Sequence, residues 1–187
     1  PIKQGKIEMG LKHTIQKIDD DYAVETFNTN ENDWEYVPGY RNLVLYGEHI
    51  SAGYLMMGKK IENFSAQLGV RAELSDIETQ LVTTNEINKR DYLNFFPSAH
   101  LSYELNKESS VQLGYSRRIR RPRQHWWLPF FSYVDERSNA SGNPNINPEY
   151  TDSYELGHLK NWNKSSLLTN VYYRYTTDVM DWVTSSD

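Results

Sequence analysis

The stretch Phe64-Ser65-Ala66-Gln67-Leu68-Gly69-Val70-Arg71-Ala72-Glu73-Leu74 decides the fold of this chain. Every second residue in it is apolar, and the residues between are Ser, Gln, Gly, Arg and Glu. Successive side chains of a β-strand point to opposite faces, whereas a helix repeats its apolar face every three to four residues. The alternation therefore predicts a strand with one apolar face and one polar face.

The same period of two recurs along the chain and predicts seven strands, while no stretch shows a convincing helical period. The strands span approximately residues 5–18, 43–57, 63–77, 91–105, 109–119, 151–162 and 166–182. Three connections are short and polar, at residues 58–62, 106–108 and 163–165, which is typical of tight hairpin turns. The other three are long, at residues 19–42, 78–90 and 120–150.

Short and long connections alternate strictly, as they do in membrane barrels with short periplasmic turns and long extracellular loops. The strands run for about ten to sixteen residues, longer than the usual five or six and long enough for a tilted bilayer crossing. We therefore predict an all-β fold, an antiparallel transmembrane β-barrel in the outer membrane of a Gram-negative cell. Residues 1–187 would form one section of it, with the long connections as extracellular loops. A soluble antiparallel barrel or sandwich is the alternative.

The composition fits a barrel better than a soluble core. The chain has 187 residues, a net charge of −5, no cysteine, and 14 Tyr, 6 Phe and 5 Trp. Its mean hydropathy of −0.75 is low, as expected when only alternate residues face lipid. Many aromatic residues fall near strand ends, as in the interfacial girdles of such barrels. The start at Pro1 and the two open sheet edges lead us to expect a section of a longer chain.

The most specific text lies between Tyr115 and Gly157. It reads YSRRIRRP at 115–122, LPF at 128–130, GNPNINPEY at 142–150 and YELG at 154–157. This text resembles the β-barrel of TonB-dependent outer-membrane receptors, and in particular the Bacteroidetes "outer membrane protein beta-barrel family". Ile146 stands where that family usually has Leu, and residues 128–130 stand where it usually has Asn-Pro-Phe.

The resemblance implies a barrel of around twenty-two strands, a plug domain outside this sequence, and uptake of a scarce nutrient driven by the TonB complex. It implies no bond chemistry and no cofactor. Expected partners are outer-membrane lipid and lipopolysaccharide, the TonB complex through the plug, and a surface lipoprotein. Two rival functions from other classes remain open: a non-transporting structural or assembly-partner barrel, and a soluble glycan-binding β-domain. An outer-membrane hydrolase built from dispersed Ser, His and Asp residues is a third and weaker alternative.

We assign two sets of candidate residues within this text. The structural motif comprises Arg118, Arg121, Pro122, Gly142, Asn143, Pro144, Pro148, Glu149, Glu155 and Gly157. Glu149 and Glu155 are expected to pair with the basic run at 117–123, as a clamp that holds barrel and loop rather than as a ligand site. His125, Trp126 and Trp127 are candidate ligand-loop contacts, although a packed loop anchor is favoured.

The sequence offers no pattern for catalysis or metal binding. Its five histidines are scattered, and it has no Gly-x-Ser-x-Gly elbow, P-loop or dinucleotide fingerprint. The acidic segment 19–35 lacks the glycine and the bidentate glutamate of a calcium loop. We therefore expect neither an enzyme nor a metal site, and the acidic balance disfavours a nucleic-acid partner.

Overall fold

The protein is built on one antiparallel sheet of seven long strands, and the computed structural model describes residues 5–128, 131–135, 138–143 and 145–183. The sheet order is β1-β2-β3-β4-β5-β8-β9, and β6 and β7 form a small separate hairpin. The strands are β1 Gly5–Asn28, β2 Asp33–Ile61, β3 Phe64–Leu81, β4 Glu86–Asn106, β5 Ser109–Arg120, β6 Phe131–Asp135, β7 Ser138–Ser141, β8 Glu149–Trp162 and β9 Ser165–Thr177. One short helix, α1 Gln124–Trp127, precedes β6.

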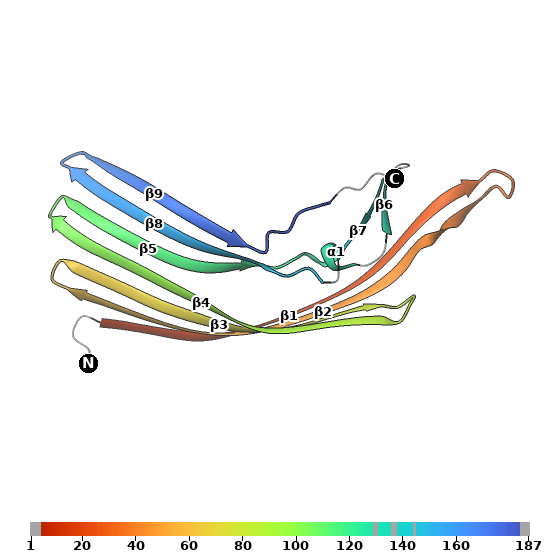
Figure 1. Ribbon diagram of the computed structural model, residues 1–187, viewed down its shortest axis with the longest axis horizontal. Helices are drawn as coiled ribbons and strands as arrows, with labels where there is room; N and C mark the ends of the chain where they lie inside the picture. The colour runs from red at the N-terminus through yellow and green to blue at the C-terminus, as the bar shows by residue number, and fades with distance from the viewer. Residues whose placement is uncertain (1–4, 129–130, 136–137, 144, 184–187) are drawn as a thin grey trace.

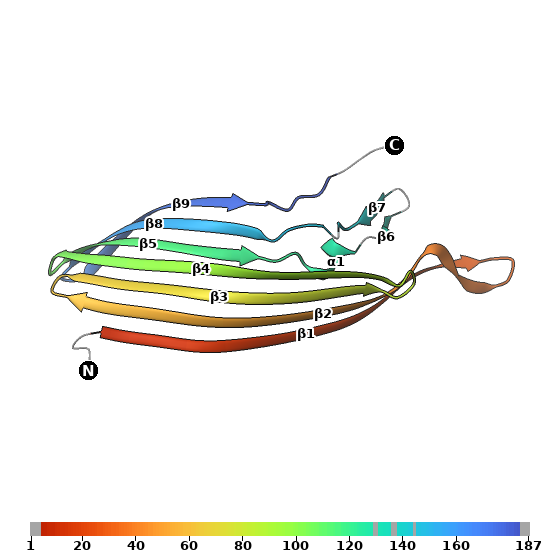
Figure 2. The ribbon, with the colours of Figure 1, turned by 60° about the horizontal axis from the view of Figure 1, so that its bottom comes forward.

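The sheet curls into part of a barrel wall (Figure 1, Figure 2). From β1 to β5 each strand pairs with the next, β5 pairs with β8 across the segment that contains α1, β6 and β7, and β8 pairs with β9. β1 pairs only with β2 and β9 only with β8 among the described residues, so the section has two open edges. α1 lies on the concave side of the curl (Figure 1).

The convex face carries the apolar side chains. Leu68, Val70 and Leu74 on β3 are 55, 43 and 55% exposed, and Leu93 lies opposite Leu74 on β4. We call this surface, from Phe64 to Leu74 and across the neighbouring strands, the apolar band. It extends over about eleven residues, which is the length that a tilted strand needs to cross a bilayer. So large an exposed apolar surface requires lipid or another apolar partner.

The band ends abruptly toward the long hairpins. Asp76 on β3 lies opposite Asp91 on β4 in the first outward-facing cross-strand pair beyond the apolar band. In the next such pair, Glu78 lies 2.7 Å from Lys89. Charged groups of this kind belong in water or among lipid headgroups, so the strands beyond this level stand outside the hydrocarbon.

Two of the three expected long loops are strand in the structure. Residues 19–42 are mostly paired between β1 and β2 and turn only at 29–32, and residues 78–90 are paired between β3 and β4 and turn at 82–85. The sequence analysis ended these strands where the apolar alternation stops. Backbone pairing continues past that point because it needs matching N–H and C=O groups, whichever side chains they carry.

Candidate functional site

The third long connection folds inward rather than outward. We call its described part, within residues 121–148, the inward loop. It packs against the concave face beyond the level of the apolar band, where Trp127 lies against Tyr46 and Ile77. Trp127 is 4% exposed and its ring centre lies 6.0 Å from that of Tyr46. Leu128 joins Val44 and Leu81 in a second small cluster beside it.

An arginine fastens the start of the inward loop to the sheet. Arg121 donates from one guanidinium nitrogen to the Glu73 carboxylate at 2.5 Å and to the Ser75 hydroxyl at 3.1 Å. Arg71 also lies 3.1 Å from Glu73. Glu73 is buried and the Arg121 side chain is 20% exposed, whereas the Arg71 side chain reaches solvent and is about half exposed. Such charge-assisted bonds are stronger and more directional than neutral ones.

A second carboxylate joins the end of β5 to the start of β8 and to the segment that follows β9. Glu149, 5% exposed, accepts a 3.0 Å bond from Arg120 and a 2.8 Å bond from the backbone N–H of Met180. Because both carboxylate oxygens are used, this buried charge is satisfied. Arg120 and Glu149 are direct cross-strand partners, although the sequence analysis did not include Arg120 in the motif.

The asparagine-rich part of the motif closes the inward loop on itself. The N–H groups of Gly142 and Asn143 donate to the carbonyls of Leu128 and Trp126, at 2.8 and 2.7 Å. The Asn143 side chain accepts from the N–H of Asn145 at 2.8 Å, as asparagine does in turns. Arg90 on β4 then donates to the Ile146 carbonyl at 3.1 Å and lies 3.4 Å from the amide oxygens of Asn145 and Asn147.

Burial tunes the ionisable groups that surround this loop beyond the band. Burial raises the pKa of the Glu48 carboxyl above its usual range, although the Arg121 guanidinium opposes the shift. Burial likewise raises the pKa of the Tyr46 hydroxyl. These groups are thereby held toward their neutral forms, as expected for polar side chains that pack beneath a loop rather than face solvent.

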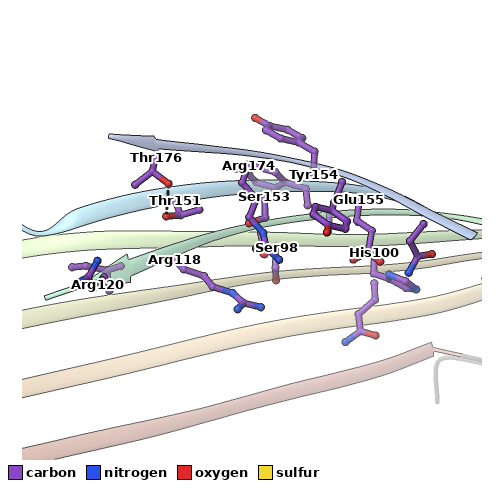
Figure 3. Close-up of a pocket in the computed structure, with 18 of the residues that line it drawn as sticks. Ser98, His100, Arg118, Arg120, Thr151, Ser153, Tyr154, Glu155, Arg174 and Thr176 are labelled. Carbon is purple, nitrogen blue, oxygen red and sulfur yellow. Dashed lines mark hydrogen bonds between the residues drawn. The ribbon is translucent and has the colours of Figure 1, made fainter. Parts of the chain in front are cut away.

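A second feature is a polar groove of about 990 Å³ along the concave wall. It lies mainly over β4, β5, β8 and β9 and extends from Arg120, beside the start of the inward loop, toward the middle of these strands. Its lining includes Ser98, Ser116, Arg118, Ser153, Glu155 and Arg174, and all of these except Ser116 are labelled in Figure 3. All of these side chains point to the concave face, because directly opposed residues on paired strands lie on the same face of a sheet and alternate residues of one strand share that face. The groove lining contains three arginines and one carboxylate.

The structure separates the predicted motif residues into different places. Arg121 and Glu149 lie in the ion pairs described above, and Pro122 and Pro148 are buried at the two ends of the inward loop. Arg118 and Glu155 lie in the groove, and Pro144 lies outside the described residues.

The expected pairing of Glu155 with the basic run is wrong for the described part of the chain. Glu155 lies opposite Gly114 on β5, and it makes no ion pair there. The pairing failed because sequence proximity does not give strand register. Gly157 has a packing role, since an added Cβ would come within 2.8 Å of the Asn170 amide oxygen.

The three candidate ligand-loop residues differ in accessibility. Trp127 is buried between the rest of the inward loop and the sheet. Trp126 packs against Trp182, with ring centres 5.3 Å apart. His125 belongs to α1, and its side chain lies outside the described residues. The structure therefore places the tryptophans as packing groups of the inward loop.

Sequence reasoning missed the partners on other strands. Glu73, Ser75 and Arg90 sit more than forty-five residues from the loop positions that they hold. The alternation of apolar and polar residues places these side chains on the polar face of the sheet, but it does not identify the residues that they bind. No helix in the described residues is long and apolar enough to cross a membrane. Across the same residues, no cluster of three or more His, Asp or Glu side chains could hold a metal ion.

An apolar convex face, a polar concave face, and antiparallel strands joined by short turns at one end define the wall of an outer-membrane β-barrel. A scan against known families matches residues 1–187 to the outer membrane protein beta-barrel family, and the chain belongs to that family. It is accordingly a protein of the outer membrane. A search of the curated proteins finds no match to this sequence.

Solved structures agree on the fold. The crystal structure of the ferric citrate transporter FecA in its unliganded form is similar, with a TM-score of 0.64 at 14% identity. The match covers 90% of this chain and 24% of the FecA chain. The sequence thus spans about a quarter of the length of that transporter, and the likeness concerns the fold of its barrel wall.

Proposed function

We propose that this chain is a section of the barrel of a TonB-dependent receptor that takes up a scarce nutrient across the outer membrane. The observation that carries the proposal is the polar concave wall, which would line a path across the membrane while the convex face meets lipid. The membership of the family and the fold likeness to a transporter support it.

In this proposal the inward loop narrows the extracellular mouth. Barrels of this kind carry their short turns on the periplasmic side, so the inward loop lies toward the outside. The Arg121–Glu73 pair, Arg90 and the buried Trp127 hold it against the wall. The loop would thereby restrict which solutes reach the lumen, and passage would follow rearrangement of a plug domain rather than bond chemistry.

The proposed partners follow from the same placement. The apolar band would contact lipid, and the charged pairs beyond it would contact lipopolysaccharide headgroups. TonB would act through a plug domain in another part of the protein. A surface lipoprotein would sit over the long hairpins, and we propose no nucleic-acid partner.

Growth under nutrient limitation tests the proposal. A strain lacking the gene and a complemented strain are compared on media limited in turn for iron chelates, cobalamin and oligosaccharides, with and without a working TonB system. The proposal predicts that one nutrient supports growth only when both the gene and the TonB system are present. Unchanged growth on every medium, together with loss of an outer-membrane complex from the deletion strain, would instead establish the non-transporting assembly partner.

Glycan binding through the tryptophans is a weaker candidate. The stacking surfaces it requires are engaged, since Trp127 is buried and Trp126 packs on Trp182.

A further inference from the structure

The concave wall carries a row of small hydroxyl side chains that the inward loop does not use. Ser98, Ser116 and Ser153 are successive cross-strand partners on β4, β5 and β8, and the row continues to Arg174 on β9. All four residues line the groove, and Ser98, Ser153 and Arg174 are labelled in Figure 3. Within the described residues none of the three serine hydroxyls has a hydrogen-bond partner. The three serines therefore offer hydroxyl donors that have no partner there, and we call this row the serine floor.

Two arginines flank this floor without a carboxylate partner among the described residues. Arg118 follows Ser116 by two positions on the same face, and no ion pair or ring contact is formed by it there. In the described part of the chain, the one interaction partner of the Arg174 guanidinium is the Tyr172 ring, whose centre lies 5.2 Å from the guanidinium carbon. Each of the other arginines in the segment 117–121 forms an ion pair with a carboxylate. The distances are 4.0 Å for Arg117 and Asp152, 3.0 Å for Arg120 and Glu149, and 2.5 Å for Arg121 and Glu73.

The spacing suits a ligand that bridges the two arginines. From strand and residue spacings, their Cα atoms are about 12 Å apart, two strands across and two residues along. Two long side chains that point to the same concave face can meet over the serine floor. A guanidinium fork matches a carboxylate or phosphate, and serine hydroxyls add neutral donors to the same oxygens.

We propose that Ser98, Ser116 and Ser153, with Arg118 and Arg174, form a luminal binding site for an oxyanion group, a carboxylate or a phosphate. The group comes either from a free anionic solute or from an acidic side chain of another part of the same protein. The site does not depend on uptake. A protein that binds the anion without transporting it would leave this inference standing and overturn only the proposed function.

The test uses the full-length protein in detergent at constant ionic strength. Inorganic phosphate and malonate are titrated by calorimetry, and thermal unfolding is followed in parallel. The double variant Arg118→Gln, Arg174→Gln is compared with Arg117→Gln, which removes a neighbouring charge on the convex face. Ser116→Leu is a second test variant, which fills the floor and keeps both arginines, so that a folding failure of the double variant leaves the question decidable.

If the oxyanion is a free solute, the wild type binds the added anion saturably. The affinity is then about tenfold or more weaker in both test variants and unchanged in Arg117→Gln. If the oxyanion is an acidic side chain of the same protein, the site is already occupied and the wild type binds neither phosphate nor malonate. In that case both test variants unfold at a temperature about 3 °C or more below that of Arg117→Gln. The proposal is overturned if the test variants bind as the wild type does. It is equally overturned if the wild type binds neither anion and the test variants unfold together with Arg117→Gln.

Discussion

At the scale of single residues, the most consequential group is the buried carboxylate of Glu73. It faces Arg121 at 2.5 Å and Arg71 at 3.1 Å while it is 6% exposed. A buried charge of this kind is costly when unpaired, and removing one partner of such a pair is strongly destabilising. The carboxylate therefore fixes where the inward loop leaves the wall.

We expect Glu73→Gln to lower the free energy of unfolding of the full-length protein by about 3 kcal/mol, because it leaves the Arg121 guanidinium buried without its counter-charge. Denaturant unfolding in detergent measures this. Glu104→Gln is the matched control, since Glu104 pairs with Lys60 at 2.5 Å where both side chains are about half exposed. That change should cost less than about 1 kcal/mol. Equal effects of the two variants would show that the Glu73 cluster has no special role.

At the scale of elements, the inward loop is the segment that sequence alone described least well. In the structure, Gly142 and Asn143 bond to the backbone of Leu128 and Trp126, and Glu149 bonds to Met180. The direction of the loop was not predictable. It depends on Arg90 and Tyr46, which belong to other strands and carry no signal of their partners.

We expect Trp127→Ala to release the inward loop from the wall, because it removes a buried aromatic side chain and such changes cost about 3–5 kcal/mol. Limited trypsin digestion measures the release at Arg123, which is exposed within the loop. Cleavage there should be several-fold faster than in the wild type.

The control is Trp162→Ala, at the short-turn end, where the ring is 52% exposed. Its cleavage rate should match that of the wild type. Identical rates in all three proteins would show that Trp127 does not hold the loop.

At the scale of the whole molecule, the period of two predicted the sheet, its strand order and its apolar face, because hairpin connectivity leaves little freedom to the order of strands. The ends of β1 to β4 were predicted too short, since pairing continues where lipid contact stops and the side chains lose their alternation. The groove could not be predicted, because it needs the register of four strands. The resemblance supplied the larger barrel that two open edges require.

The central claim is that the convex face meets lipid and the concave face meets a polar interior. Single cysteines can be introduced at each position from Phe64 to Leu74 and spin-labelled in the full-length protein in bilayers. This sequence contains no cysteine, and any cysteine in other parts of the protein is first replaced by serine. The account predicts that accessibility to oxygen is high at Ala66, Leu68 and Val70 and low at Gln67 and Gly69, with the reverse order for a water-soluble nickel complex. Equal access of the nickel complex at every position would contradict it.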